Sequence, residues 1–408
     1  MPKRSALDAS LDGGGGAAAA LALPKAKGKR KAADPTTIRS RGAAGLRWRL
    51  ALSTLSSRPL SVTRIRADDD LAPGLSPAEA SLLRLLSKLT SGSNIEIDST
   101  GASLKYVPGV IVGGAVDHDC RASGRSVGWF VEALLAILPF AKRDSVVRLR
   151  GITADAVDPS PEFLAASALP LLERFGAAED AGPDGLGIRV LRRGCAPGGD
   201  GLVELRVTAV RSLAPIDLLD CGQVKAVRGT AASCQASAAV ARRAVDGARA
   251  PLETLLRDVW IAVDARRGRD AGGVAGYSIL LTAETTSGCA LSAEAVADSH
   301  DGAGGASGGA ALPEDVGRRA AATLLSEVGH SGCVDSAMQP LCLALMTLTP
   351  EDVSRVRFGK LSSAAVAMLR LLKEVFGITF KLTADRETNT VLASCLGRGY
   401  ANVSKANT

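Results

Sequence analysis

Apolar and polar positions along the chain alternate between helical spacing and strand spacing. Ser76-Pro77-Ala78-Glu79 is a capping box with proline at the first helical position, and leucines at helical spacing follow it through residue 89. Two short runs come next, 94–98 and 102–106, and a Ser-Thr-Gly turn separates them. This order predicts a helix followed by a β-hairpin.

The helix-then-hairpin pattern recurs twice. One predicted helix opens at Ser160-Pro161-Glu162 and ends at Phe175-Gly176, and another spans 362–376 and ends before Gly377. The hairpins that follow these helices are predicted at 188–193 with 202–207 and at 378–382 with 390–395. Three such units predict an α/β (α+β) fold, with a large domain in which each unit lays a helix on a sheet.

The pattern between the second and third units is different. A long helix over 236–256 lies between the strand-like segments 224–230 and 259–263, and a further strand is predicted at 277–284. These elements predict a smaller inserted α/β domain, which we place at residues 209–287.

The large domain is then discontinuous. It spans residues 45–208 and 288–405, and the glycine-rich residues 298–311 within its second part predict a flexible loop. A Pro-Glu-Asp sequence that begins at Pro313 restarts a helix after this loop.

Positive charge is concentrated in the first 44 residues. They contain nine lysines and arginines against three aspartates, so this segment carries +6 of the formal net charge of +7. Its low-complexity composition predicts a disordered basic tail over 1–44. The remaining chain is close to neutral, so any contact with nucleic acid there has to come from local clusters.

The tail contains a compact group of basic residues. They are Lys25, Lys27, Lys29, Arg30 and Lys31. Such a group in an extended segment is typical of a nuclear localisation signal, which offers exposed lysines to an acidic receptor groove. The alternative is a basic tail that only contributes to solubility.

Composition argues against two other classes of protein. No run of about 18 apolar uncharged residues occurs, so no membrane span and no membrane partner are expected. The eight cysteines include no C-x-x-C pair, which predicts buried free thiols in a reducing compartment and no zinc site.

Several long segments follow one another in the order found in a known family. They include SNIEIDSTGASLKYVPGVIVGG at 93–114, RSVGWFVE at 125–132, LRRGCAPGGDG at 191–201 and GCVDS at 332–336. From about residue 46 to 405 the chain resembles the RNA 3′-terminal phosphate cyclase superfamily, and within it the cyclase-like nucleolar branch. The resemblance implies a large domain of repeated helix-plus-sheet units with a smaller inserted α/β domain.

The chain departs from this family at the active site. Cyclases are adenylated on the histidine of an H-x-x-D-Q helix, because an imidazole attacks the α-phosphate of ATP. In the register set by Gln339, Asp335 replaces this histidine and Met338 replaces the aspartate of the motif. SRGAAG at 40–45 stands where cyclases have a glycine-rich loop with an acidic residue. This degenerate active site implies a protein with no catalytic residues, no cofactor and no metal.

Two arginines align with arginines near the cyclase active site. They are Arg47 and Arg66, and they suggest a cleft that binds an anion or RNA without the nucleophile. The alternative is that Arg66 pairs with an aspartate of the group 68–70.

Other basic residues are candidates for RNA or partner contact. Arg370 and Lys373 lie at i and i+3 on the last predicted helix, where they bind RNA or form an ordinary solvated face. Its arginines make the inserted domain the most basic folded piece, and we expect it to face a partner. The candidates there are Arg242, Arg243, Arg266, Arg267 and Arg269.

The resemblance implies a function in the nucleus. It implies a non-catalytic assembly factor of the nucleolar small-subunit processome, the early 90S pre-ribosome that contains a small nucleolar RNP. Such a factor is needed for early pre-rRNA processing and 18S rRNA maturation. It acts as a scaffold with a large ribosome-biogenesis GTPase, as a monomer within a large assembly.

Two enzymatic alternatives remain open. One is a pre-rRNA endonuclease, for which the acidic residues 68–70 beside Arg66 are the only local carboxylate cluster that could hold magnesium. The other is a residual cyclase that is adenylated at Asp335.

Overall fold

The computed structural model describes residues 36–178, 185–297 and 312–405, which fall in one compact unit. The expected nuclear localisation signal at 25–31 and the expected flexible loop at 298–311 lie outside these residues. The predicted disordered tail is wrong at its end, because Ile38–Arg41 forms strand β1 and pairs in parallel with strand β2. No helix of the described residues is both long and apolar enough to span a bilayer.

Three repeated units, which together we call the body, share one order of elements and one sheet topology. The first unit consists of β1 (Ile38–Arg41), α1 (Leu46–Ser56), β2 (Leu60–Thr63), α2 (Pro77–Leu89), β4 (Asn94–Ile97) and β5 (Leu104–Val107), with sheet order β1-β2-β5-β4. The second consists of β7 (Gly113–Asp119), α3 (Val127–Ile137), β8 (Arg143–Gly151), α4 (Pro161–Arg174), β9 (Gly187–Arg192) and β10 (Gly201–Val207), with order β7-β8-β10-β9. The third consists of β11 (Asp217–Leu218), α7 (Gln339–Thr347), β16 (Val353–Phe358), α8 (Ser363–Phe376), β17 (Lys381–Asp385) and β18 (Thr390–Leu396), with order β11-β16-β18-β17. The short strands β3 (Thr90–Ser91) and β6 (Val110–Ile111) pair between the first two units.

The three predicted helix-then-hairpin units are therefore confirmed, and each is longer than predicted. The hairpins β4–β5, β9–β10 and β17–β18 are all antiparallel. Each unit also begins with a strand, a helix and a second strand, and in each the first two strands pair in parallel. Parallel partners are separated by a whole helix, so no local turn signal marks them.

Local capping explains where the predicted helices begin. The Ser76 hydroxyl accepts a hydrogen bond from the Glu79 N–H at 3.3 Å, and the Glu79 carboxylate accepts one from the Ser76 N–H at 2.8 Å. Ser160 and Ser362 cap α4 and α8 in the same way, by accepting from the N–H groups three residues later. These bonds satisfy donors that the first turn of a helix leaves free.

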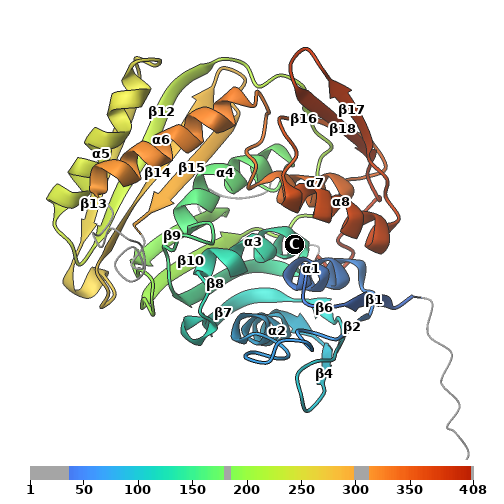
Figure 1. Ribbon diagram of the computed structural model, residues 1–408. Coiled ribbons are helices and arrows are strands. Elements are labelled where there is room, and N and C mark those ends of the chain that lie inside the picture. The colour runs from blue at the N-terminus through green and yellow to red at the C-terminus, as the bar shows by residue number, and fades with distance from the viewer. Residues whose placement is uncertain (1–35, 179–184, 298–311, 406–408) are drawn as a thin grey trace, which may run out of the picture. The chain divides into compact units, whose positions relative to one another are not determined.

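Helices α3 and α7 lie inside the body (Figure 1). Every residue of α3 and of α7 is buried. A helix that is apolar all round has no solvent face and is found in the core. The sequence GCVDS and the cyclase-like site position precede α7, so this helix anchors the candidate site.

A fourth sheet, which we call the insert sheet, interrupts the third unit between β11 and α7 (Figure 1). Its elements are β12 (Val224–Cys234), α5 (Ala238–Glu253), β13 (Val259–Arg266), β14 (Gly276–Thr285), β15 (Ala290–Val296) and α6 (Pro313–Gly329), with strand order β13-β12-β14-β15. Helices α5 and α6 pack together on one face, and α4 of the second unit contacts β14 and β15.

The sheet topology differs from the predicted insert, 209–287, at both ends. Strand β11 pairs in parallel with β16, so residues 217–218 belong to the third unit. Strand β15 pairs with β14, and α6 packs on α5, so the insert continues through residue 329. The sequence prediction stopped at 287 because β15 follows a tight turn and was not recognised as a strand.

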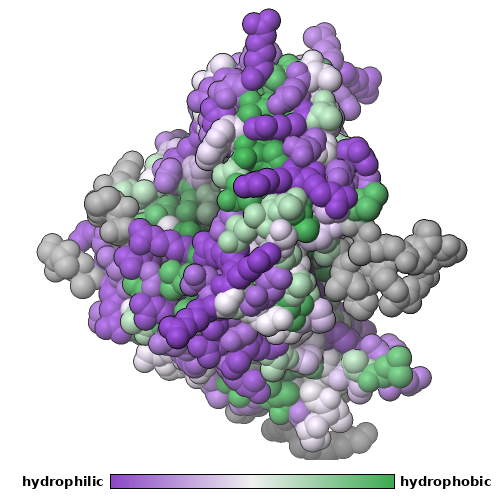
Figure 2. All heavy atoms as spheres, turned by 90° about the vertical axis from the view of Figure 1, so that its left-hand side faces the viewer, coloured by the Kyte–Doolittle hydropathy of each residue, from purple (hydrophilic) through white to green (hydrophobic). Residues whose placement is uncertain are grey.

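Two glycines allow α5 and α6 to approach closely. A Cβ atom on Gly317 of α6 would lie 2.0 Å from the Ala244 carbonyl oxygen, and one on Gly247 of α5 would lie 2.2 Å from the Glu314 carbonyl oxygen. The helices are therefore in backbone contact, which no side chain larger than glycine permits at these positions. Figure 2 shows the face over α5 and β13, where hydrophilic side chains dominate and smaller hydrophobic areas lie between them.

Candidate functional site: the cavity beside Asp335

Asp335 lies in the segment that connects α6 to α7, and its side chain is buried. One carboxylate oxygen accepts from the Met338 N–H at 2.9 Å, and the other accepts from the Ser292 N–H of β15 at 3.4 Å. Burial raises the pKa of Asp335 to about 6. The carboxylate fastens the turn before α7 to the insert sheet.

Gln339 is held by the loop before α8. Its side-chain amide donates to the Lys360 carbonyl oxygen at 3.0 Å and accepts from the Ser362 N–H at 2.8 Å. Both hydrogen-bonding ends of the amide are occupied within the protein. Asp335 and Gln339, the two residues of the degenerate motif, therefore support the structure around α7.

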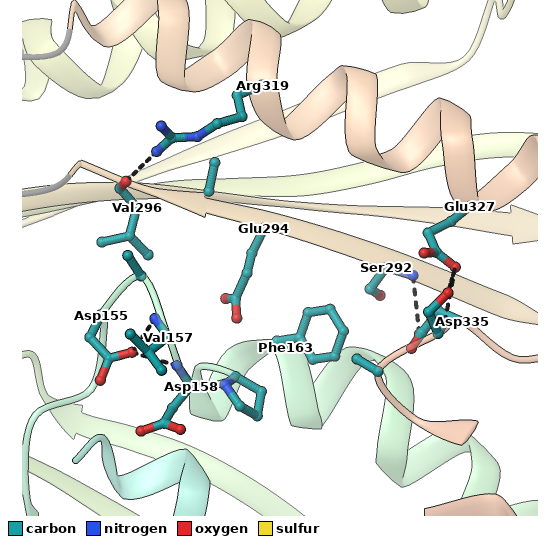
Figure 3. Close-up of a pocket in the computed structure, with 15 residues that line it drawn as sticks. Asp155, Val157, Asp158, Phe163, Ser292, Glu294, Val296, Arg319, Glu327 and Asp335 are labelled. Atoms are coloured by element: carbon teal, nitrogen blue, oxygen red, sulfur yellow. Dashed lines mark hydrogen bonds between the residues drawn. The ribbon is translucent and has the colours of Figure 1, made fainter. Parts of the chain in front are cut away.

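A cavity of about 430 Å³ opens beside Asp335 (Figure 3). Its walls come from the loop before α4, from β15 and α6 of the insert, and from the segment 335–337. The ionisable side chains that line it are Asp155, Asp158, Glu294, Glu327, Asp335 and Arg319. Five carboxylates thus face a single guanidinium.

The arginine and all five carboxylates already have partners; those of Asp335 are given above, and Asp155 accepts from the Val157 and Asp158 N–H groups. Arg319 donates to the Val296 carbonyl oxygen at 2.6 Å, and Asp158 pairs with Arg125 at the neighbouring surface. Glu327 accepts from both the N–H and the hydroxyl of Ser336. Glu294 points into the cavity in Figure 3, where one oxygen accepts from the Ser160 N–H at 2.9 Å.

The electrostatics of this cavity disfavour a phosphate group. Burial raises the pKa of Glu294 to about 7 and also raises that of Asp155, because an ionised carboxylate is poorly solvated there. A triphosphate or an RNA phosphate would add negative charge to this set of carboxylates. Asp335 thus borders a cavity whose charge disfavours a nucleotide phosphate.

Arg47 is not available to an anion. Its guanidinium donates to the Trp129 carbonyl oxygen at 2.9 Å and pairs with Glu132 at 2.7 Å. It also lies over the rings of Trp48 and Trp129, at 5.7 and 5.3 Å from their centres. Burial raises the pKa of Glu132, so the arginine neutralises an otherwise costly buried acid between α1 and α3.

Arg66 is held by a partner that the sequence did not suggest. Its two terminal nitrogens grip both oxygens of Glu79, at 2.7 and 2.8 Å, and it also donates to the Gly74 carbonyl oxygen. The alternative of a pair with residues 68–70 is wrong as well, because Asp68 pairs with Arg64 and Asp69 accepts from the Leu71 and Ala72 N–H groups. In the described part of the chain, no group of three or more His, Cys, Asp or Glu side chains is arranged to hold a metal ion.

The remaining basic candidates lie on separate surfaces. Arg370 and Lys373 are exposed on α8, and neither forms a salt bridge with any described residue. In the insert, Arg243 pairs with Glu314 at 2.6 Å, Arg266 pairs with Asp264 at 3.1 Å, and Arg267 donates to the Ala236 carbonyl oxygen. Arg242 and Arg269 are exposed and have no salt-bridge partner among the residues described. The five insert arginines therefore do not form one free basic patch.

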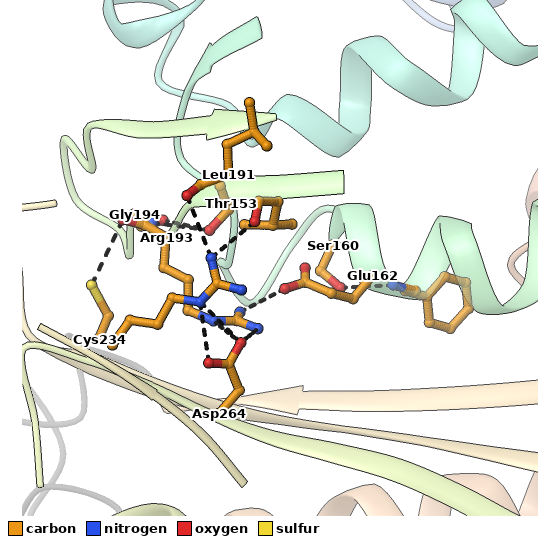
Figure 4. Close-up of polar contacts among 11 residues, drawn as sticks. Thr153, Ser160, Glu162, Leu191, Arg193, Gly194, Cys234 and Asp264 are labelled. Atoms are coloured by element: carbon orange, nitrogen blue, oxygen red, sulfur yellow. Dashed lines mark hydrogen bonds and ion pairs between the residues drawn. The ribbon is translucent and has the colours of Figure 1, made fainter. Parts of the chain in front are cut away.

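A buried arginine that sequence reasoning missed joins the insert to the body. Arg193 follows β9, and its guanidinium pairs with Glu162 of α4 at 2.6 Å and with Asp264 of β13 at 2.7 Å (Figure 4). Desolvation opposes its charge, but the two carboxylates more than compensate, and its pKa is raised. The partners lie 31 and 71 residues away in sequence, so no local pattern indicates this contact.

Comparison with known proteins agrees with the fold and the motif order. A family model described as RNA 3′-terminal phosphate cyclase matches residues 38–382. The human RNA 3′-terminal phosphate cyclase-like protein is 44% identical over 366 residues, which cover 88% of this chain and 95% of the human protein. The rRNA processing protein rcl1 of Schizosaccharomyces pombe is 40% identical over 371 residues, which cover 90% of this chain and 97% of the yeast protein. The chain therefore belongs to the RNA 3′-terminal phosphate cyclase family.

Proposed function

We propose that this protein takes part in rRNA processing as a member of its family that performs no catalysis. The proposal rests on the surroundings of Asp335, the residue that the resemblance places where cyclases have their nucleophilic histidine. Asp335 is buried and accepts hydrogen bonds from two backbone N–H groups, and the cavity beside it is lined by five carboxylates and one arginine. A buried carboxylate that is fixed in this way is a poor nucleophile, and its surroundings repel the phosphate that it would have to attack.

A relative supports a role in rRNA processing, and the basic tail supports a location in the nucleus. The fission yeast protein is named an rRNA processing protein, and its alignment with this chain spans nearly all of both proteins. The basic group at 25–31 supports transport to the nucleus. The finer proposal is a nucleolar factor of the small-subunit processome, needed for 18S rRNA maturation, that acts with a large ribosome-biogenesis GTPase.

The proposed mechanism is scaffolding. The candidate arginines of the former active site, Arg47 and Arg66, are used to hold α1 to α3 and the loop 66–74 to α2. Of the predicted candidates, the exposed Arg242 and Arg269 on the insert and Arg370 and Lys373 on α8 remain to contact a partner or pre-rRNA.

Two measurements on one preparation test this proposal. The purified full chain is incubated with radiolabelled ATP, divalent metal and an RNA oligonucleotide that ends in a 3′-phosphate. We expect no label on the protein and no cyclic phosphate on the RNA, whereas a catalytic family member under the same conditions gives both. Covalent label at Asp335 would overturn the proposal.

The second measurement addresses the pathway. The tagged protein is recovered from nuclear extract, and its associated proteins and RNAs are identified. We expect a large GTPase and precursors of 18S rRNA. Recovery of mature RNAs that carry 3′-phosphates, without any pre-rRNA, would indicate an enzyme of RNA ends instead.

A further inference from the structure

Two thiols meet where the insert sheet touches the body. Cys195 follows β9 of the second unit, and Cys234 is the last residue of β12. Together with Ala271 they form a small buried cluster that is separate from the main core. Cys234 pairs in register with Gly276, and a Cβ atom on Gly276 would lie 2.7 Å from the Cys195 sulfur. The Cys195 sulfur therefore rests on the insert sheet beside Cys234.

Backbone hydrogen bonds and ion pairs hold the segment around Cys195 against the segment around Cys234. The Cys234 sulfur lies 3.9 Å from the Arg193 carbonyl oxygen and 3.8 Å from that of Gly272 (Figure 4). The Gly272 N–H donates to the same Arg193 carbonyl oxygen at 2.6 Å. The Arg193 guanidinium also clamps the junction through its two carboxylate partners. A disulfide requires two cysteine side chains that lie close together, and these two belong to one buried cluster.

Both thiols are buried, but one borders a cavity and the pKa of the other is lowered. Cys195 lines a second cavity, of about 570 Å³, which Arg125 and Tyr277 border as well. A small oxidant in that cavity therefore lies next to Cys195. The hydrogen bond with the Cys195 thiol lowers the pKa of Cys234 below that of an ordinary thiol, and the thiolate is the form that reacts with oxidants.

The other cysteines differ in their surroundings. Burial raises the pKa of Cys120 and of Cys395 to about 12, and neither is in hydrogen-bonding contact with another thiol. Cys342 is buried in α7, and burial raises its pKa as well. Cys221, Cys289 and Cys333 form a second group at the root of the insert, where the chain itself already connects insert and body.

We propose that Cys195 and Cys234 are a site of reversible oxidation, at which a hydroperoxide converts the two thiols into a disulfide that ties the insert to the body. One sulfur, as a thiolate, attacks a peroxide oxygen and becomes a sulfenic acid, and the first water leaves. The other thiol then attacks the sulfenic sulfur, the S–S bond forms, and a second water leaves. Two thiols and one hydrogen peroxide thus give one disulfide and two waters. A dithiol reductant reverses the reaction by exchange. The proposal does not depend on the function proposed above.

Peptide mapping of the oxidised full chain tests this site. The reduced protein is treated with hydrogen peroxide, its remaining thiols are alkylated, and it is digested without reduction for mass spectrometry. We expect a peptide pair joined through Cys195 and Cys234 that disappears after dithiothreitol. The pair should be lost in C234S and in C195A, and it should persist in C342S, which removes an equally buried thiol of helix α7, away from this junction.

Amide hydrogen exchange of the same samples tests whether the disulfide holds the insert to the body. The Arg193 N–H donates to the Asp270 carbonyl oxygen, and the Gln235 N–H donates to the Arg266 carbonyl oxygen, so both report on the junction. We expect their exchange to slow severalfold on oxidation of the wild type and to stay unchanged in C234S. The proposal is overturned if folded wild-type protein keeps both thiols reduced under peroxide, or if cross-links occur only among Cys221, Cys289 and Cys333.

Discussion

Arg47 forms a salt bridge with one buried carboxylate, that of Glu132. Glu132 is fully inside the body, and Arg47 supplies its counter-charge, with the side chain of Arg47 itself only 16% exposed. We expect R47M to lower the free energy of unfolding by about 3–5 kcal/mol, because removing one partner leaves an unpaired buried charge. Urea unfolding measures this loss.

The matched control is R355M, which breaks the exposed Arg355–Asp217 pair and should lower the free energy of unfolding by about 1 kcal/mol or less. Equal costs for the two variants would contradict the structural role of Arg47.

Asp335 should make stability depend on pH. Its pKa is about 6 in the folded protein and about 3.9 in an unfolded chain. A raised acid pKa means that the folded state is favoured while the carboxyl group is protonated, and that this stability is lost as the pH rises from about 4 to about 6. D335N removes the loss, so its stability relative to wild type should increase by roughly 3 kcal/mol between pH 4 and pH 7. Denaturant unfolding at both pH values measures the difference, with D70N as the exposed control. A difference that does not change with pH would show that the Asp335 pKa is not raised.

At the scale of elements, the contact between α5 and α6 depends on glycine. A methyl group at residue 317 has to displace the Ala244 carbonyl oxygen, which lies 2.0 Å from the Cβ position. We expect G317A to destabilise the protein by about 2 kcal/mol or more, since overpacking forces the backbones apart. Gly329 ends the same helix with no atom within 4 Å of its Cβ position, so G329A should be neutral or slightly stabilising. Thermal unfolding compares the two variants, and a G317A protein as stable as G329A would refute the close helix contact.

Elements with local signals were the ones that the sequence predicted. The serine caps of α2, α4 and α8 lie within three residues of their partners, and the hairpins join through short turns. Strand β1 has only four residues and follows a low-complexity tail, and its pairing with β2 crosses a whole helix. Periodicity alone carries no information about such distant partners. Strand β15 was missed for a different reason, since it pairs with its neighbour β14 across a tight turn and the sequence prediction ended the insert before that turn.

The same limit applies to the candidate site. The motif register placed Asp335 and Gln339 at a degenerate active-site position, and this assignment stays a prediction. Arg47 pairs with Glu132, which lies 85 residues away, and Arg66 pairs with Glu79, which lies 13 residues away. The sequence did not indicate either partner, so both arginines were candidates for anion binding. The carboxylate-lined cavity is assembled from three distant segments and could be found only in the folded chain.

At the scale of the whole molecule, the tail and the folded unit should be separable. Residues 36–408 group into a compact unit apart from 1–35, and β1 begins only at Ile38. We expect deletion of 1–35 to leave the unfolding midpoint unchanged but to keep a fluorescently tagged protein out of the nucleus, because Lys25–Lys31 are removed. Deletion of 1–44 also removes an edge strand and should lower the midpoint. Nuclear accumulation of the shorter deletion would refute the localisation signal.

The central claim is that this protein supports rRNA processing without chemistry at the former nucleophile. The most direct test is to replace the fission yeast relative with this chain, or with its D335N or R47M variant, and to measure the ratio of 18S rRNA to its precursors. We predict that wild type and D335N restore the ratio equally, and that R47M restores it less because it is less stable. Failure of a stably folded D335N protein, alongside success of the wild type, would contradict the claim and assign the carboxylate a catalytic role.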